Sequence, residues 1–515
     1  MSRCLNSLRI VFLVSVLGVA GCVVNPVTGQ REIALVSAQQ EISIGQEQYV
    51  PSQQMQGGAY RTDPELSAYV NQVGQKLAIA SGVDLPYEFV VLNNSVPNAW
   101  ALPGGKIAVN RGLLTELRNE AELAAVLGHE IAHAAARHGA KRVERGILSQ
   151  GVLLAAAIGA SGTEYSQEVL GGAAMATQLL NQKYSRDAER EADFYGTEFM
   201  AKAGYDPYGA VTLQETFVRL SGAGATDWVN GLFASHPASQ ERLNNNRGLL
   251  KRLRSEGFSG GRLGQPEYAR AMQPLVNAKS AYEAYDEARE LYAEGNYDAA
   301  LAKVNQSLSM RDNEALFHGL RGSIRFRQNR YEDAITNFDR ALARDDSYFL
   351  YYLSRGLSYA ELGQRDVARR DLSASVRLLP TAPAYQALGK LAEADGDVER
   401  AKQYYAQAGQ SNGQEGQAAR ASLVRLELPS QPAKYIAARV SRDDRDRLVL
   451  QVNNRASLAL ADIVIQVELM TANGVRSTTS RLERLGPGET RLSLLNVDPA
   501  QVQSVNAYPV SARLF

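Results

Sequence analysis

The chain has 515 residues with 55 basic and 55 acidic side chains, so its formal net charge is zero. A neutral chain without a basic stripe gives no reason to expect a nucleic-acid partner. Its length predicts roughly two to four domains, and its single pair of cysteines excludes a disulfide-rich scaffold.

The N-terminus has the pattern of a secretory signal peptide. Arg3 and Arg9 precede an apolar run at residues 10–20, which is too short to span a bilayer. The run leads into V-A-G-C at positions 19–22, which resembles the lipobox of bacterial lipoproteins. We therefore expect residues 1–21 to be removed as a lipoprotein signal peptide.

Cys22 would then carry lipid and anchor the chain to a membrane. The alternative is an ordinary signal peptide with an incidental cysteine. The other cysteine, Cys4, would leave with the signal, so the mature chain would contain no disulfide. Because Val23 follows the cysteine in place of aspartate, we expect sorting to the outer membrane.

Two regular elements are predicted in the next part of the chain. Residues 105–110 alternate in polarity and carry β-branched side chains, which predicts a strand. Residues 120–138 are rich in Ala, Leu and Glu and lack Pro, which predicts a helix with Asn119 as its N-cap.

This helix contains a candidate metal-binding motif, H-E-x-x-H. His129 and His133 lie one turn apart on one face, so both imidazoles can reach the same ion. Glu130 lies close enough to act as a base on a water bound to that ion. The motif also occurs by chance, so a third ligand decides its meaning.

An acidic segment at residues 186–193, R-D-A-E-R-E-A-D, can supply that ligand. Glu189 would complete a His2Glu set of the kind found in zinc hydrolases. Asp193, one turn later, could accept a hydrogen bond from a ligand histidine. Glu191 competes with Glu189 but would face away from it. The alternative, a solvated run of charges, is disfavoured by the upstream H-E-x-x-H.

Two apolar stretches, residues 147–158 and 171–180, lie between the two parts of this candidate site. Both are shorter than the roughly 18–20 residues that a membrane span needs. We expect buried helices that cover the site, with a mobile lid as the alternative.

These motifs resemble the zinc metallopeptidases related to HtpX and the CAAX prenyl proteases, and most of all the periplasmic BepA-like branch. The resemblance covers roughly residues 25–250 and includes further motifs in the family's order. They are N-P-V-T-G at 25–29 with A-L-V-S at 34–37, N-A-W-A-L-P-G-G-K-I at 98–107, and S-H-P at 235–237 with R-L at 242–243.

The resemblance implies one zinc ion per chain, bound by His129, His133 and Glu189, with Glu130 as the catalytic base. It also places His236 near the metal, where this histidine would fill the fourth position at rest; the alternative is an ordinary loop histidine. His138 is expected to end the predicted helix and to favour its dipole.

When water attacks a peptide carbonyl, the oxyanion that forms needs a hydrogen-bond donor or a positive charge to stabilise it. The sequence offers three candidates and does not choose among them: Tyr184, Arg186 and Tyr195. The resemblance further implies that the strand with Lys106, Ile107, Ala108 and Val109 borders the cleft. That strand would pair with an extended substrate through main-chain hydrogen bonds, the alternative being a scaffold strand.

A glycine-rich segment follows, and residues 256–278 are predicted to be a linker. Beyond it Ala300, Ala334 and Ala368 recur at steps of 34 residues. This period is typical of tetratricopeptide (TPR) repeats, about four of which would fill residues 279–411 and offer a surface to protein partners.

The last part of the chain changes character again. Residues 447–453, 462–469 and 490–495 alternate as strands. Residues 430–515 are therefore predicted to form a small Ig-like β-sandwich, a departure from the BepA-like branch with an expected role in docking or stability.

The expected fold class is α+β. A mostly helical zincin-type peptidase domain with a small sheet would occupy residues 22–255, followed by an α-solenoid of repeats and the β-sandwich. The expected function is a lipid-anchored zinc endopeptidase in the periplasm of a Gram-negative cell. It would degrade misfolded or misassembled envelope proteins, with the repeats recruiting substrates or assembly machinery. The alternative is a chaperone or assembly factor for outer-membrane proteins with a closed zinc site.

Overall fold

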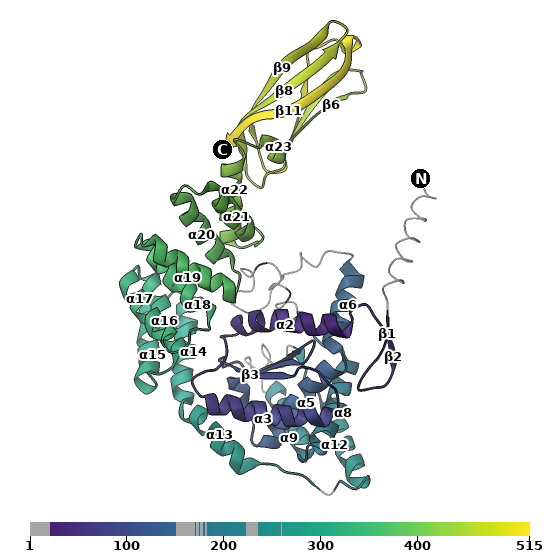
Figure 1. Ribbon diagram of the computed structural model, residues 1–515, viewed down its shortest axis with the longest axis vertical. Helices are drawn as coiled ribbons and strands as arrows, with labels where there is room; N and C mark the ends of the chain where they lie inside the picture. Colours follow the sequence, from purple (N-terminus) through teal and green to yellow (C-terminus); the bar gives the residue numbers. More distant parts are fainter. Residues whose placement is uncertain are drawn as a thin grey trace. The chain divides into compact units, whose positions relative to one another are not determined.

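The computed structural model describes residues 21–150, 170, 175, 179–180, 183–222, 235–258 and 260–515 (Figure 1). The predicted signal peptide up to residue 20 and most of the two apolar stretches lie outside these residues. The chain divides into two compact units, Met1–Leu379 and Pro380–Phe515, and each is described by itself.

The first unit begins with two small sheets. β1 (Gly21–Val24) pairs antiparallel with β2 (Arg31–Ala34), and β3 (Glu88–Leu92), β4 (Ala99–Leu102) and β5 (Lys106–Asn110) form a three-stranded sheet. β5 is its central strand, parallel to β3 and antiparallel to β4. Figure 1 shows the sheet between α2 (Ala38–Gln54) and α3 (Pro64–Ser81).

The first unit contains further helices before residue 256, and two of them carry candidate ligands. These further helices are α4 (Arg111–Leu114), α5 (Glu120–Ala135), α6 (His138–Gln150), α8 (Arg186–Lys202), α9 (Tyr208–Gly222) and α12 (Gln240–Ser255). Asn119 caps α5 as expected, because its side chain accepts a hydrogen bond from the backbone of Glu122.

The helix predicted to reach residue 138 ends earlier. Arg137 has a φ of 62°, in the left-handed region that non-glycine residues rarely adopt, and separates α5 from α6. Its guanidinium pairs with buried Glu41 and donates to the carbonyl of Val36 at 2.7 Å. These contacts with a distant segment hold the break.

A close glycine contact sets the distance between α5 and α8. A Cβ added to Gly196 would lie 2.8 Å from the carbonyl carbon of Gly128 and from the backbone nitrogen of His129. Only glycine fits at so close an approach of two backbones. The two helices that carry the candidate ligands are therefore held in direct backbone contact.

The linker predicted at residues 256–278 is wrong over most of its length. It contains α13 (Gln265–Asn277), which has Pro266 in its first turn. The helix buries Tyr268, whose hydroxyl donates to the carbonyl of Leu114 at 2.6 Å. The buried face of α13 packs against α3 and α5. The glycine-rich start of the segment did not indicate a helix that packs in this way.

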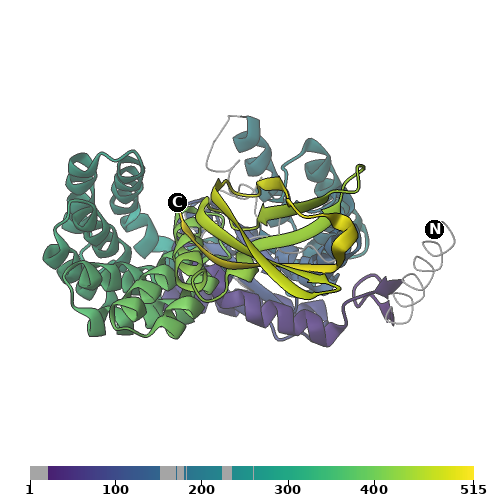
Figure 2. The same ribbon diagram turned by 90° about the horizontal axis from the view of Figure 1, so that it is seen from above.

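Three pairs of antiparallel helices complete the first unit, and Figures 1 and 2 show them stacked side by side. They are α14 (Lys279–Ala293) with α15 (Tyr297–Met310), α16 (Ala315–Arg327) with α17 (Tyr331–Leu342), and α18 (Phe349–Glu361) with α19 (Arg365–Leu378). Ala300, Ala334 and Ala368 are fully buried, which explains why the 34-residue step requires a small side chain.

The repeats are joined to the earlier part of the unit by buried polar contacts. The carboxylate of Glu314, which is fully buried, accepts hydrogen bonds from Thr62 (2.8 Å) and Asn93 (3.0 Å). The side chain of Gln54 accepts a bond from the backbone of Phe349 at 2.8 Å. A buried carboxylate must be satisfied in this way to avoid a large desolvation cost, so the junction is specific.

The second unit continues with one more helix pair and ends in strands. Its elements are α20 (Ala382–Ala394), α21 (Val398–Ala408), α22 (Gln414–Glu427), α23 (Pro432–Tyr435), β6 (Ile436–Arg442), β7 (Leu448–Asn454), β8 (Leu460–Thr471), β9 (Gly474–Leu485), β10 (Thr490–Leu494), η2 (Pro499–Gln501) and β11 (Val502–Leu514). The strands form two antiparallel sheets, β10-β7-β6 and β11-β8-β9. Leu450 and Val452 from one sheet and Ile463 and Ile465 from the other share one apolar core.

The predicted fold class is confirmed: the chain is mostly helical with small sheets, contains helical repeats and ends in antiparallel sheets. Among the helices described, none has the length and apolar character to cross a bilayer.

Candidate metal centre

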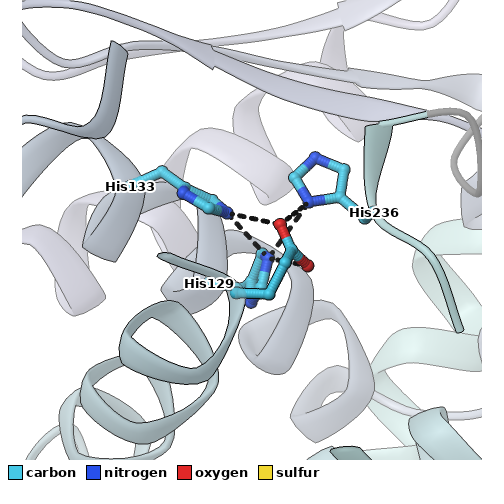
Figure 3. A group of neighbouring side chains, drawn as sticks. His129, His133 and His236 are labelled. Carbon is cyan, nitrogen blue, oxygen red and sulfur yellow. Dashed lines mark hydrogen bonds and ion pairs between the residues drawn. The ribbon is translucent and has the colours of Figure 1, made fainter. Parts of the chain in front are cut away.

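Four donors from three segments converge in one buried cluster. His129 and His133 come from α5, Glu189 from α8, and His236 from the segment before α12 (Figure 3). One donor atom of each residue lies within 4.8 Å of the other three. His133, Glu189 and His236 are at most 3% exposed, so these polar groups have lost their contact with bulk water.

The spacing of these donors fits a tetrahedral metal site. His133 Nε2 lies 3.0 Å from His129 Nε2 and 3.3 Å from Glu189 Oε1. His236 Nδ1 lies 3.2 Å from His129 Nε2 and 2.9 Å from Glu189 Oε1. Zinc bonds of about 2.1 Å at tetrahedral angles place ligand atoms about 3.4 Å apart. The four residues therefore form a metal-binding cluster.

The charge states of His133 and Glu189 suit a cation. Burial lowers the pKa of His133 well below its usual range, so its imidazole is neutral and has a free lone pair. Burial raises the pKa of Glu189, but the neighbouring side chains of His236, Arg242 and His129 outweigh this and hold that pKa well below its usual range. Glu189 is therefore an ionised carboxylate in a buried place.

Asp193 and Arg242 contact ligands of the cluster and orient them. Asp193 Oδ1 lies 3.0 Å from His129 Nδ1, which leaves His129 Nε2 for the metal. Arg242 of α12 donates to both carboxylate oxygens of Asp193 at 2.7 Å and lies 2.8 Å from Glu189 Oε2. In the sequence, Arg242 stands out only as part of the motif that begins at Ser235, and its six-residue spacing from His236 is the available signal.

His138 has a role different from the one expected. It begins α6, where it does not meet the C-terminal dipole of α5. Its Nδ1 lies 2.8 Å from His133 Nδ1, and its Nε2 lies 2.8 Å from Glu191. With His133 Nε2 facing the metal, His133 donates to His138 and His138 to Glu191. Glu191 thus faces away from Glu189, as predicted, and supports the cluster indirectly.

Glu130 is placed next to the cluster and is 1% exposed. Its Oε1 lies 3.6 Å from His236 Nε2. Within the described part of the chain, Glu130 Oε2 and His236 Nε2 are buried without a hydrogen-bond partner. A buried carboxylate oxygen with no protein donor has capacity for a proton or a water, as a general base requires.

The substrate strand expected at Lys106, Ile107, Ala108 and Val109 is wrong. These residues form β5, and both of its edges are occupied, by β3 and by β4. Its main chain therefore has no free edge for another strand. Among the described strands of this sheet β4 lies at an edge, and α5 packs against it.

The three oxyanion candidates differ in position. Tyr184 is buried and stacks on His133, with ring centroids 3.7 Å apart and an interplanar angle of 18°. Its hydroxyl accepts a hydrogen bond from Arg142 at 3.1 Å. Arg186 is exposed at the start of α8, and Tyr195 is only partly buried. Tyr184 alone of the three contacts a residue of the cluster.

Family models match separate parts of the chain. Residues 64–249 match the model of peptidase family M48, and this range includes all four members of the metal-binding cluster. Residues 285–349 and 382–412 match models of the tetratricopeptide repeat.

Similar curated proteins include metalloendopeptidases and beta-barrel assembly-enhancing proteases. Mitochondrial metalloendopeptidase OMA1 of Schizosaccharomyces pombe is 37% identical over 183 residues, 34% of this chain and 50% of that protein. The beta-barrel assembly-enhancing protease of Escherichia coli (strain K12) is 29% identical over 228 residues, 42% of this chain and 46% of that protein.

A protein of the same name from Yersinia pestis is 25% identical over 382 residues, which cover 69% of this chain and 76% of that protein. The chain spans about half the length of the first two relatives. With the His-Glu cluster inside the matched region, residues 64–249 are a metallopeptidase domain of family M48, joined in one chain to tetratricopeptide repeats.

Proposed function

We propose that the chain is a zinc-dependent endopeptidase of the bacterial envelope that cleaves misfolded or misassembled envelope proteins. The carrying observation is the tetrahedral spacing of His129, His133, Glu189 and His236, with the unpartnered carboxylate oxygen of Glu130 beside it. A purely structural site needs no such base, because all its positions are closed by ligands.

The residues divide the reaction between them. Zinc, when bound by His129, His133 and Glu189, supplies Lewis acidity toward a water molecule and the peptide carbonyl. Glu130 accepts the proton of the attacking water and passes it to the leaving amine. Asp193 fixes the ring of His129, and its pairing with Arg242 keeps it ionised for that task.

His236 supports a closed resting state. Its Nδ1 stands at the position that a water or a substrate carbonyl would need, 2.9 Å from Glu189 and 3.2 Å from His129. The segment that carries it must withdraw before cleavage. This observation also favours the second candidate function, an assembly factor or chaperone for outer-membrane proteins whose metal site stays closed.

Substrate class and location rest on other observations. Several relatives are named beta-barrel assembly-enhancing protease, among them those of Escherichia coli and Yersinia pestis. The V-A-G-C sequence at positions 19–22 supports lipid attachment to Cys22 and a place at the periplasmic face of the outer membrane. The helical repeats support recruitment of substrates or of assembly machinery.

The decisive experiment uses the full chain and a fluorescently labelled, unfolded outer-membrane porin. Glu130→Gln should keep one zinc per chain and lose cleavage by about 10²–10⁴-fold, whereas a chelator should abolish cleavage by the parent chain. Equal cleavage by Glu130→Gln and the parent would overturn the proposed mechanism. Binding of porin without cleavage, even after His236→Ala opens the site, would establish the second candidate.

The ligand assignment and the anchor have their own tests. Glu189→Gln should lose zinc, while Glu191→Gln, on the same helix, should keep a zinc affinity within about tenfold of the parent's.

In cells given radioactive palmitate, the parent chain should become labelled and Cys22→Ala should not. Label on the Cys22→Ala variant would exclude this cysteine as the anchor.

A further inference from the structure

Two neighbouring positions of the repeat array hold the same arginine in different surroundings. Arg321 of α16 and Arg355 of α18 are 34 positions apart, one step of the repeat. Each extends toward the second helix of its own pair and toward the second helix of the pair before it. The two sites can therefore be compared residue by residue.

At the later position the arginine is neutralised. Arg355 makes a bidentate bond to Asp371, at 2.6 and 2.8 Å, and a third bond to Asp339 at 2.7 Å. Burial lowers the pKa of Arg355, but these two carboxylates more than offset that effect and raise it above its ordinary value. This arginine is fully engaged inside the protein.

At the earlier position the same two places hold asparagines. Arg321 donates to Asn337 at 2.6 Å and to Asn305 at 3.3 Å. These amides accept hydrogen bonds but carry no charge. Burial, together with the charges of Arg340 and Arg325, lowers the pKa of Arg321. The positive charge of Arg321 thus has no carboxylate partner comparable to those of Arg355.

Arg321 lines a pocket of about 440 Å³ between α15, α16 and α17, here named the arginine pocket. Arg340 and Arg344 from α17 and the residues just after it line the same pocket. Asp312 is the one acidic side chain in this lining, so three positive charges face one negative charge. Arg344 is held in place by the carbonyls of Asp312 (3.1 Å) and Arg340 (2.8 Å).

A buried histidine adds an acceptor to these donors. His318 is 5% exposed and lines the pocket, and its Nε2 donates to the carbonyl of Asp312 at 2.8 Å. Burial and the nearby arginines lower the pKa of His318, so its ring is neutral and Nδ1 is an acceptor. This Nδ1 is buried and has no partner within the described residues.

The donors and the acceptor together suit an anion that also carries a hydrogen-bond donor. Arginine clusters recognise carboxylates and phosphates, and inorganic phosphate at neutral pH also has an O–H that could donate to His318, so it is a competing ligand that the test must separate. An acidic peptide supplies both carboxylates and main-chain N–H groups. A tetratricopeptide array is also a framework for protein partners.

We propose that the arginine pocket binds an acidic segment of a protein partner, with its carboxylates on Arg321, Arg340 and Arg344 and a main-chain N–H on His318 Nδ1. This site rests on the recruiting role in the proposed function and specifies its chemistry. It lies in the repeats and uses no residue of the metal centre.

The sharpest test places around Arg321 the two carboxylates that neutralise Arg355. Asn305→Asp with Asn337→Asp gives Arg321 the two carboxylates that Arg355 already has. We expect the double variant of the full chain to fold, and to bind a fluorescein-labelled polyglutamate peptide at least about tenfold more weakly than the parent does. A polyglutamine peptide of the same length should bind neither protein.

A matched pair of charge reversals completes the test. Arg340→Glu, exposed and in the pocket lining, should weaken peptide binding about tenfold or more. Arg370→Glu, exposed on α19 and outside that lining, should change it less than about twofold. Unchanged binding in both the double variant and Arg340→Glu would overturn the proposal.

The other anionic ligands are outcomes of the same assay. If binding of phosphatidylglycerol vesicles, or of inorganic phosphate, depends on Arg340 while the peptide does not bind, the protein-partner proposal is wrong. Cleavage of a short uncharged peptide by the double variant should equal that of the parent. Absence of cleavage in both proteins would count against the proposed function, whereas loss of polyglutamate binding alone concerns only the pocket.

Discussion

Helices approach each other through glycine in both the metal centre and the repeats, but the glycines face different neighbours. Gly196 of α8 meets the backbone of α5 at Gly128, whereas Gly322 of α16 meets the ring of Phe338 in α17. A ring can tilt away from an added methyl group, but a backbone moves only with its whole helix. The metal centre therefore tolerates little displacement, and the repeats tolerate more.

The largest expected effect comes from Gly196→Ala. The new Cβ would lie 2.8 Å from the backbone of Gly128 and His129, so α8 must shift and carry Glu189 away from the histidines. We expect zinc affinity, measured by competition with a chelator, to fall about 100-fold or more, in the upper range for changes behind a metal ligand. Unchanged affinity would show that the contact does not set the ligand geometry.

The next largest effect is expected when lysine replaces an arginine that makes a bidentate bond to an aspartate. Arg242→Lys keeps the charge but loses the bidentate bond to Asp193, so zinc affinity should fall about 10–100-fold. Arg355→Lys breaks a similar fork to Asp371 in the repeats and should leave zinc affinity unchanged. Equal losses in both variants would indicate global destabilisation in place of a local effect.

A smaller effect is expected from Gly322→Ala in the repeats. The added Cβ would lie 2.7 Å from the ring of Phe338, which can adjust at a cost of about 1–3 kcal/mol. Urea denaturation should show this loss in the free energy of unfolding, with zinc affinity preserved. A fall in zinc affinity would mean that the repeats and the metal centre are more tightly coupled than their contacts indicate.

The smallest effect, and one of opposite sign, is expected from Gly248→Ala. Gly248 lies inside α12, is exposed, and has no neighbour within 4 Å of an added Cβ. Alanine should raise the free energy of unfolding by about 0.5–1 kcal/mol because it loses less backbone entropy. Destabilisation at this position would argue against a role for glycine contacts in the other two variants.

Sequence patterns located the residues of the cluster that are close in the chain. His129 and His133 share a helix face by spacing alone, and Glu189 and Asp193 share a face of α8 by the same spacing. The bond between His138 and Glu191 joins residues 53 positions apart, and no local pattern carries it. It depends on the break at Arg137, which contacts with a distant segment hold.

The fold was predictable to the level of elements but not of pairing. Alternation identified residues 105–110 as a strand, yet it cannot tell a central strand from an edge strand, since both alternate. The repeat period was clear from Ala300 and its equivalents because each must fit against a neighbouring helix. One repeat turn has Asn329 with a φ of 58° where its neighbours have glycine, since asparagine also tolerates that conformation.

The N-P-V-T-G motif that begins at Asn25 has a consequence for the position of the metal centre. Asn25 is fully buried and donates to the carbonyl of Ala136, directly after the helix that carries both histidine ligands. With lipid on Cys22, as proposed, three residues span at most about 10 Å between the membrane and this contact. So short a connection would hold α5, with its two histidine ligands, at a nearly fixed distance from the membrane. The enzyme would then select substrates by their distance from the lipid surface.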